Sequence, residues 1–275
     1  MAYTLNPITP EKLATLEGFA NKPFAEQADD INRLAKEFLI RNPKWIGFAQ
    51  KKDASLKDKY KDEELLREEL SSYPGLKALA AHEAAHAFYK KGVEHQPNAR
   101  AISEAAASLT GADIHPGADI NPFVFIDHAK GVVIGETATI GQGTQIFHGV
   151  TLGAVGKSDG KDGPRHPQIG ENVVLSADTQ IMGAGHVHDG VLIGPASQIV
   201  KSEIGAGAVI KPGTHIENVA IEANQVLMPV GQQIFTNERS KAVPEDKQKD
   251  LDTLLSPHMV KVASITDNVM DKLRG

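Results

Sequence analysis

The sequence predicts an α+β protein: an all-helical N-terminal domain, a parallel β-helix of hexapeptide repeats and a short helical C-terminal tail. Two observations carry this prediction. An aliphatic residue returns every six residues through the middle of the chain, and the composition changes abruptly near residue 110. A period of six fits neither an α-helix nor a simple strand, and it indicates a chain that turns a corner after every short strand. The expected domains are 1–110, 111–235 and 236–275.

The six-residue repeat runs in two unbroken series, followed by a one-residue slip after Ile199. Its members are Ile134, Ile140, Ile146, Leu152, Ile169, Leu175, Ile181, Val187, Ile193, Ile199, Ile204, Ile210 and Ile216. We expect these side chains to point into the axis of a coil in which three strands make one turn. Glycine stands beside many of them, and we expect these glycines to take positive φ at tight corners. They are Gly135, Gly141, Gly170, Gly194 and Gly205.

The first part of the chain is rich in Ala, Leu, Glu and Lys with helical spacing. It predicts a helix that opens at Pro10 and four more over about 24–40, 63–70, 76–89 and 99–109. Gly92 and Pro97 separate the last two. Beyond the repeats, residues 244–273 read as one or two charged amphipathic helices, interrupted at Pro257.

Two insertions interrupt the repeat. The spacing stretches to eight residues between Ile126 and Ile134, in a stretch that carries Asp127 and His128. It stretches to seventeen between Leu152 and Ile169, in a loop that ends Arg165-His166-Pro167. A solenoid accommodates insertions as loops on one face, which is commonly the face that binds ligands. Both insertions therefore mark a candidate site.

Composition excludes several classes of protein. The chain has 275 residues, 41% of them hydrophobic and 23% charged, and a net charge of −6, which disfavours a nucleic-acid partner. No apolar stretch reaches membrane-spanning length and no signal peptide is evident, so we expect a cytoplasmic protein with no membrane association. The absence of cysteine excludes disulfides, thiolate metal sites and a cysteine nucleophile.

One motif has two interpretations. His82-Glu83-Ala84-Ala85-His86 matches the H-E-x-x-H pattern of zinc proteases, in which two histidines one helical turn apart bind zinc. The motif lies in an Ala-rich helix with no third ligand at a recognisable spacing. The alternative, which we favour, is a pair of histidines on a packing or interface face.

The chain resembles serine O-acetyltransferases of the hexapeptide-repeat acyltransferase family over about residues 73–213. The segments that carry the resemblance are Tyr73-Pro-Gly-Leu, His82-x-x-Ala-His86, Gly111-Ala-Asp-Ile-His-Pro-Gly117, Phe125-Ile-Asp-His128, Gly131-Val-Val-Ile-Gly-Glu-Thr137, Gly149-Val-Thr-Leu-Gly153, Gly156-Lys157 and Arg165-His-Pro167. The resemblance implies transfer of acetyl from acetyl-CoA to the L-serine hydroxyl, which gives O-acetylserine for cysteine biosynthesis. It also implies a left-handed coil and trimers that pair into hexamers through the helical domains.

Acetyl transfer to an alcohol requires a base, and histidine titrates in the suitable range. His128 is the candidate base, and a carboxylate must hold its ring in one tautomer. Asp113 lies fifteen residues earlier, close to one coil, and it matches the family's partner for that histidine. For the acceptor, Asp127 offers a charge to the serine ammonium, and Arg165 offers a planar fork to its carboxylate, with His166 beside it.

The resemblance places acetyl-CoA, the co-substrate, at Ala154 and Ala177, and it implies no metal. Lys157 in the loop either pairs with a phosphate of the coenzyme or is simply solvated. L-cysteine is the expected feedback inhibitor. The chain departs from the family pattern at Tyr60 and Glu83, which leaves other hydroxyl-bearing acceptors open. Gly275 stands where the family carries a C-terminal Ile, so we expect no tight cysteine synthase complex through the tail.

Two other classes of function remain as alternatives. A γ-carbonic-anhydrase-like zinc enzyme would use three histidines that converge across a subunit boundary. The candidate ligands are His128, His148, His166, His186 and His188. No pair reproduces that family's ligand spacing. A non-catalytic assembly scaffold is the third possibility.

Overall fold

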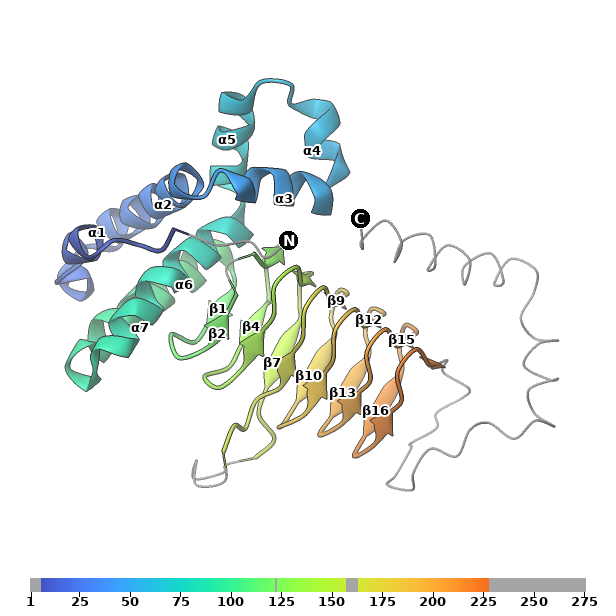
Figure 1. Cartoon of the computed structure of the whole chain (residues 1–275). Coiled ribbons are helices and arrows are strands. Elements are labelled where there is room, and N and C mark those ends of the chain that lie inside the picture. The colour runs from blue at the N-terminus through green and yellow to red at the C-terminus, as the bar shows by residue number, and fades with distance from the viewer. Residues whose placement is uncertain (1–5, 122, 157–162, 228–275) are drawn as a thin grey trace, which may run out of the picture.

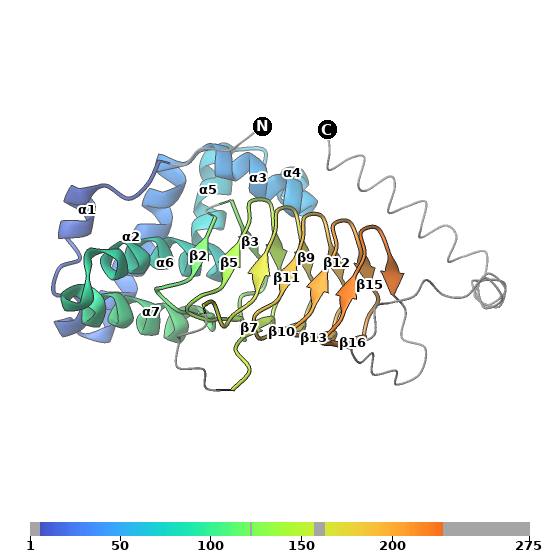
Figure 2. The same cartoon turned by 60° about the horizontal axis from the view of Figure 1, so that its bottom comes forward.

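The structure, a computed structural model, describes residues 6–121, 123–156 and 163–227. Helices gather at one end of a long β-helix (Figures 1 and 2). The predicted tail, 236–275, and the candidate coenzyme residue Lys157 lie outside the described residues. The division of the chain into three domains therefore stays a prediction. No helix in the described ranges combines the length and the apolar character needed to cross a membrane.

The helical region contains more helices than the sequence predicted. The α-helices are α1 (Pro10–Ala14), α2 (Phe24–Arg41), α3 (Lys44–Lys52), α4 (Ala54–Lys59), α5 (Glu63–Ser72), α6 (Pro74–Lys91) and α7 (Gln96–Thr110), with 3-10 turns η1 (Phe19–Asn21) and η2 (Val93–His95). Helices α3 and α4 were not predicted, because Pro43 and Gly47 interrupt a short pattern. Packing against the β-helix accounts for α3. Its Trp45 lies 6.0 Å from Phe125, and its Phe48 lies 5.6 Å from Phe123, between ring centroids.

The β-helix consists of three parallel sheets, each of six strands. Sheet A contains β1 (Asp113–Ile114), β4 (Val133–Ile134), β7 (Thr151–Gly153), β10 (Gln180–Met182), β13 (Gln198–Val200) and β16 (His215–Glu217). Sheet B contains β2 (Asp119–Ile120), β5 (Thr139–Ile140), β8 (Gln168–Ile169), β11 (His186–Val187), β14 (Glu203–Ile204) and β17 (Ala220–Ile221). Sheet C contains β3 (Phe125–Ile126), β6 (Gln145–Ile146), β9 (Val174–Leu175), β12 (Leu192–Ile193), β15 (Val209–Ile210) and β18 (Val226–Leu227).

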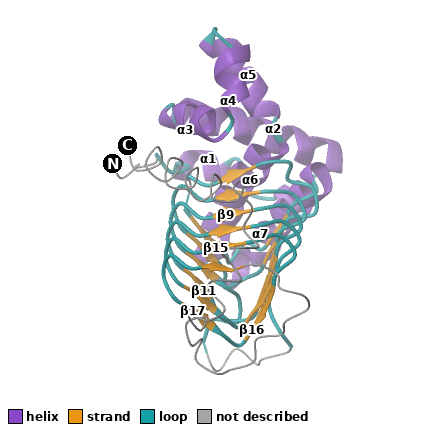
Figure 3. Cartoon of the chain, turned by 90° about the vertical axis from the view of Figure 1, so that its right-hand side faces the viewer, coloured by secondary structure: helices purple, strands orange, loops and turns teal. Residues whose placement is uncertain are grey.

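The aliphatic repeat forms the axis of the coil, as the sequence predicts. Ile134 pairs with Leu152, and Leu152 pairs with Ile181 on the next coil. These three side chains are at most 2% exposed. Burial of each such side chain contributes about 1.5–3 kcal/mol, so a stack of them holds the short strands together. The prediction of a helical region followed by a parallel β-helix is confirmed by the strand order and by the stacked coils of Figure 3.

The explanation expected for the glycines beside the repeat is wrong. None of the five adopts positive φ, which occurs instead at other corner positions such as Gly131 and Gly149. A Cβ added at Gly141 would lie 2.5 Å from the backbone of Gly170, on the next coil. A Cβ at Gly194 would lie 2.5 Å from the nitrogen of Pro212. These positions are glycine because adjacent coils approach closely there, not because the backbone is left-handed.

Helix α6 packs across the first coils and touches two of their corners. Near its start, a Cβ at Gly75 would lie 1.9 Å from the carbonyl oxygen of Ile126. Farther along, the His86 Nδ1 lies 2.8 Å from the Pro116 carbonyl oxygen. Near its end, the Tyr89 hydroxyl donates to Glu136 Oε1 at 2.9 Å. The helix thereby positions the segments that carry the candidate site.

Candidate active site

Two corners of the β-helix hold the predicted site residues. We call them corner C–A, where the chain passes from sheet C to sheet A, and corner A–B, where it passes from sheet A to sheet B. Asp127 and His128 follow β3 and precede β4, so they lie at corner C–A. Arg165 and His166 follow β7 and precede β8, so they lie at corner A–B.

At corner C–A, the insertion presents an accessible imidazole beside a carboxylate. The side chain of His128 is 75% exposed, and its Nε2 lies 3.6 Å from Asp127 Oδ1. Its ring centroid lies 6.2 Å from that of His148, in an edge-on arrangement. His128 has φ of 52°, a left-handed conformation that histidine adopts more readily than bulky or β-branched residues. The base candidate is thus open to a substrate.

Asp113 lies on the same corner, one coil earlier. It opens β1 and pairs with Val133 of β4, while the Gly131 amide donates to the Gly111 carbonyl at 2.8 Å. Among the described residues, no hydrogen bond or ion pair joins Asp113 to His128. The carboxylate adjacent to His128 is that of Asp127. The role of Asp113 in orienting the ring stays a prediction.

Tyr73 lies beside the same corner at the start of α6. Burial, reinforced by the carboxylates of Asp53, Glu69 and Asp127, raises the pKa of Tyr73 to about 12. The phenol is therefore a neutral hydrogen-bond donor at physiological pH. The Tyr-Pro-Gly segment is part of the family resemblance, but the sequence predicted no role for this side chain.

At corner A–B, Arg165 and His166 belong to a connected polar network. Arg165 Nη2 donates to Glu136 Oε2 at 3.1 Å. The backbone amides of Arg165 and His166 both donate to Thr137 Oγ1, each at 3.1 Å. Two hydrogen bonds lower the pKa of Glu136: the one from Tyr89 has the larger effect, and the one from Arg165 the smaller. The carboxylate therefore stays ionised and anchors the guanidinium.

The backbone fixes the tautomer of His166. The Thr137 amide donates to His166 Nδ1 at 3.1 Å, so Nδ1 is the acceptor and Nε2 carries the proton of the neutral ring. Burial, with the charge of Arg165, lowers the pKa of His166, so the ring stays neutral at pH 7. A Cβ at Gly135 would lie 2.1 Å from this ring, so only glycine leaves room for it. His166 can therefore donate a hydrogen bond through Nε2.

Three members of this network were not predicted from the sequence: Glu136, Thr137 and Tyr89. Tyr89 and His115 pack edge-on, with ring centroids 5.8 Å apart. Burial lowers the pKa of His115. The signal for Glu136 and Thr137 was present, because both belong to the Gly131–Thr137 segment of the resemblance. Their support of Arg165 and His166 could be seen only in the structure, because it depends on a contact between two coils.

Strand β4 separates the two corners within one chain. It leaves corner C–A at Val133 and reaches the Glu136-Thr137 segment at corner A–B. Four residues of extended chain span roughly 13 Å. In the described part of the chain, no hydrogen bond or ion pair joins the His128 group to the Arg165 group. One chain by itself does not bring the predicted acceptor groups together.

The coenzyme candidates divide between the same two corners. The Ala177 carbonyl lies at corner C–A and accepts from the Ala196 amide at 2.9 Å. Ala154 follows β7 directly, at corner A–B. An open cleft of about 440 Å³ runs along corner A–B over successive coils. Its lining includes His166, Gly185, His186, Lys201 and Glu203.

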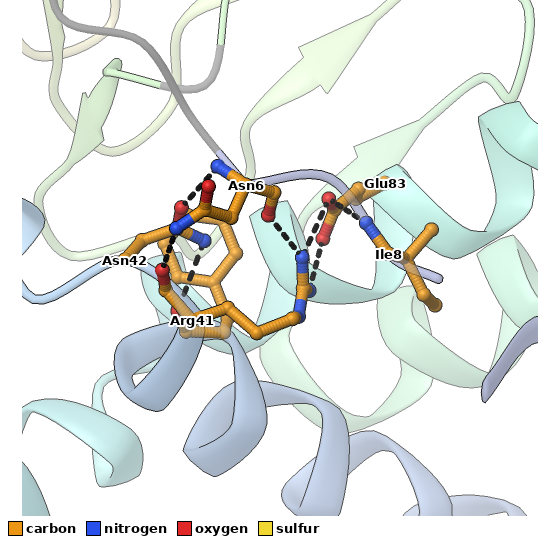
Figure 4. A network of polar contacts seen from close by, with 6 residues as sticks. Asn6, Ile8, Arg41, Asn42 and Glu83 are labelled. Atoms are coloured by element: carbon orange, nitrogen blue, oxygen red, sulfur yellow. Dashed lines mark hydrogen bonds and ion pairs between the residues drawn. The ribbon is translucent and has the colours of Figure 1, made fainter.

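The Glu83 side chain of the H-E-x-x-H segment binds other residues of the helical region (Figure 4). Glu83 Oε2 pairs with Arg41 Nη2 at 2.7 Å, and Glu83 Oε1 accepts from the Ile8 amide at 2.8 Å. His82 is buried, and this burial lowers its pKa to about 3. The arrangement supports the packing interpretation. Across the described ranges, no three His, Cys, Asp or Glu side chains converge as a metal site would require.

The fold and the site together describe a parallel β-helix of hexapeptide repeats with ionisable groups at two of its corners. No family model matches the chain. A serine acetyltransferase from Helicobacter pylori is 47% identical over 141 residues, 51% of this chain and 79% of the relative. One from Staphylococcus aureus is 42% identical over 149 residues, 54% of this chain and 68% of the relative. The chain belongs to the serine acetyltransferase family.

Solved structures agree with this assignment. Serine acetyltransferase isoform 3 from Entamoeba histolytica, in complex with cysteine, has a TM-score of 0.51 at 27% identity, covering 88% of this chain and 74% of that one. The Neisseria gonorrhoeae serine acetyltransferase has a TM-score of 0.51 at 26% identity, covering 81% of this chain and 70% of that one. The predicted family and its acyltransferase class are confirmed by these relatives.

Proposed function

We propose that this chain transfers acetyl from acetyl-CoA to the hydroxyl of L-serine at a site completed between two subunits. The observation that carries the proposal is the division of the acceptor groups between opposite ends of sheet A. A homotrimer that sets corner C–A of one subunit against corner A–B of the next would unite them. Pairing of two trimers into a hexamer is the further assembly expected of the family.

His128 acts as the general base in this proposal. Its exposed ring takes the proton from the serine hydroxyl while the serine oxygen attacks the thioester carbonyl. The C–S bond then breaks, and the protonated His128 returns a proton to the departing thiolate of coenzyme A. Asp127 beside the ring attracts the serine ammonium. Asp113, on the preceding coil, would orient the ring once substrate is bound.

Corner A–B of the neighbouring subunit holds the serine carboxylate. Arg165 uses one nitrogen on Glu136, which leaves the rest of its guanidinium fork for a ligand. His166 adds a donor through Nε2, the nitrogen that the Thr137 amide leaves protonated. The pantetheine arm of acetyl-CoA would run between the subunits past Ala177 and Ala154. Small side chains at those positions let the coenzyme approach the backbone.

L-cysteine is proposed as a feedback inhibitor that occupies the serine site, because it carries the same ammonium and carboxylate. The cysteine complex of the Entamoeba histolytica relative supports this extension. A cytoplasmic location follows from the same biosynthetic role.

The test is release of coenzyme A thiol from acetyl-CoA with serine, homoserine or threonine as acceptor. We expect serine to give the highest kcat/KM, since Asp127 and Arg165 fix its two charged groups around a short side chain. Equal rates with all three would contradict serine as the acceptor. Absence of thiol release with any acceptor would favour a non-catalytic scaffold. Mass measurement of the native assembly tests the trimer separately.

A further inference from the structure

The outer face of sheet C differs from the outer faces of sheets A and B. Its outward positions carry four aliphatic residues in register on consecutive coils: Val174, Leu192, Val209 and Val226. We call these four residues the sheet C stripe. Apart from Ala220, the matching positions on the other two sheets are polar: Gln180, Gln198, His215, Gln168, His186 and Glu203. Alternate residues of a strand face opposite sides, so the stripe points away from the coil axis.

The protein already covers one end of this face with a helix. Phe125 occupies the same outward position on the first coil and is only 1% exposed, because Trp45 of α3 packs against it. Phe125 pairs with Gln145, and Gln145 pairs with Val174, where the stripe begins. Beyond this point the described helices end (Figures 1 and 2). Val226 is 57% exposed.

We propose that the C-terminal segment 258–273 of the same chain docks on the sheet C stripe as an amphipathic helix. The described chain ends at Leu227 in β18, which is itself a strand of sheet C. The segment that follows Pro257 carries Val262, Ile265, Val269 and Leu273 on one helical face. Sixteen helical residues span roughly 24 Å, and three coil steps along the stripe span roughly 14 Å.

Charge complementarity sets the orientation of the docked helix. Glu171, Asp189 and Glu222 lie exposed at the corner between sheets B and C, along one edge of the stripe. In a helix over 258–273, Lys261 and Lys272 border one side of the apolar face. They are eleven residues apart, roughly 16 Å, which matches the spacing of the acidic edge. Opposite charges along the rim fix the register of such a contact.

Paired cysteines test the contact, because the natural chain has no cysteine. The test variant is Val209→Cys with Val269→Cys in the full chain. The matched controls join Val269→Cys to Gln198→Cys or Glu203→Cys, the outward positions of the two preceding strands. We expect an intramolecular disulfide in at least about tenfold higher yield for the Val209 variant, because docking raises the effective concentration of the two thiols.

Three results would overturn the proposal: equal yields in the three variants, no disulfide, or a product of dimer mass only. The last would assign the stripe to a second copy of the chain. Trypsin cleavage supplies a second measurement that does not depend on cysteine geometry. We expect Val209→Lys to accelerate cleavage at Lys261 about tenfold, and Gln198→Lys to leave it unchanged. An unchanged rate in Val209→Lys also overturns the proposal.

Discussion

The two corners at the ends of sheet A hold their functional side chains in opposite ways. At corner A–B, Arg165 and His166 are fixed by Glu136, Thr137 and the end of helix α6. At corner C–A, His128 is 75% exposed, and its adjacent polar contact is Asp127 at 3.6 Å. The first corner is complete within one chain, whereas the second presents its imidazole to a partner or a ligand.

This difference fits a division of labour between recognition and chemistry. Groups that bind the charged ends of a substrate gain from being held in place beforehand, because less freedom is lost on binding. A general base must reach the reacting hydroxyl and must exchange protons with it. The fixed corner therefore suits recognition of the acceptor, and the open corner suits proton transfer. Four substitutions test or sharpen this comparison.

The largest expected effect is at the open corner. His128→Ala lowers kcat by at least about a hundredfold while acetyl-CoA still binds, because removal of a general base costs two to four decades. Steady-state kinetics and coenzyme binding measured on the same preparation check this. His148→Ala is the matched control, since its ring lies 6.2 Å away and has no assigned role in proton transfer. Near-normal turnover in His128→Ala would contradict the assignment.

A second substitution tests how α6 supports the open corner. Gly75→Ala places a Cβ 1.9 Å from the Ile126 carbonyl oxygen, so the helix or the Asp127 segment must move. We expect a loss of about 1–3 kcal/mol in unfolding free energy, with lower kcat at temperatures where the variant is folded. Chemical denaturation measures the first effect. Gly47→Ala is the control. Gly47 lies within α3, and nothing lies within 4 Å of a Cβ added there. We therefore expect this variant to gain about 0.5–1 kcal/mol in unfolding free energy.

At the fixed corner, Arg165→Lys raises KM for serine about tenfold, with a much smaller change in KM for acetyl-CoA. An ammonium cannot bind Glu136 and a carboxylate through one planar fork. Arg100→Lys provides a surface control, because its side chain is half exposed and, among the described residues, its guanidinium pairs with Glu104 at 2.6 Å, one helical turn away. If both KM values rose equally, Arg165 would belong to the coenzyme site instead.

The smallest expected effect concerns the buried histidine of α6. Burial lowers the pKa of His82 to about 3, below its ordinary value of 6.5, so the unfolded chain binds the proton more readily. Stability is therefore lost as the pH falls below about 6.5, by about 1 kcal/mol between pH 6.5 and pH 5.5. His82→Gln should flatten this dependence in denaturation measured at the two pH values. A dependence as steep as that of the parent protein would show that other groups cause it.

The repeat could be recognised from the sequence because a coil corner recurs at a fixed interval. Each inward aliphatic residue reports a local geometry, and the two insertions interrupt that geometry at Asp127-His128 and before Arg165. Segments specific to the family then supplied the activity. Helix α3 could not be predicted in this way, because a short helix beside Pro43 depends on packing against Phe123 and Phe125.

The sequence by itself determined the coil, the family and the residue types available for acetyl transfer, since these depend on spacing along the chain. Only the tertiary structure decided how those residues are supported. It assigned Gly141 and Gly194 to close approach between coils, and Glu136 and Thr137 to the support of Arg165 and His166. It also divided the candidate site between two corners. The physical reason is that such contacts join different coils, or join a coil to α6, and no local pattern in the sequence encodes which segments meet.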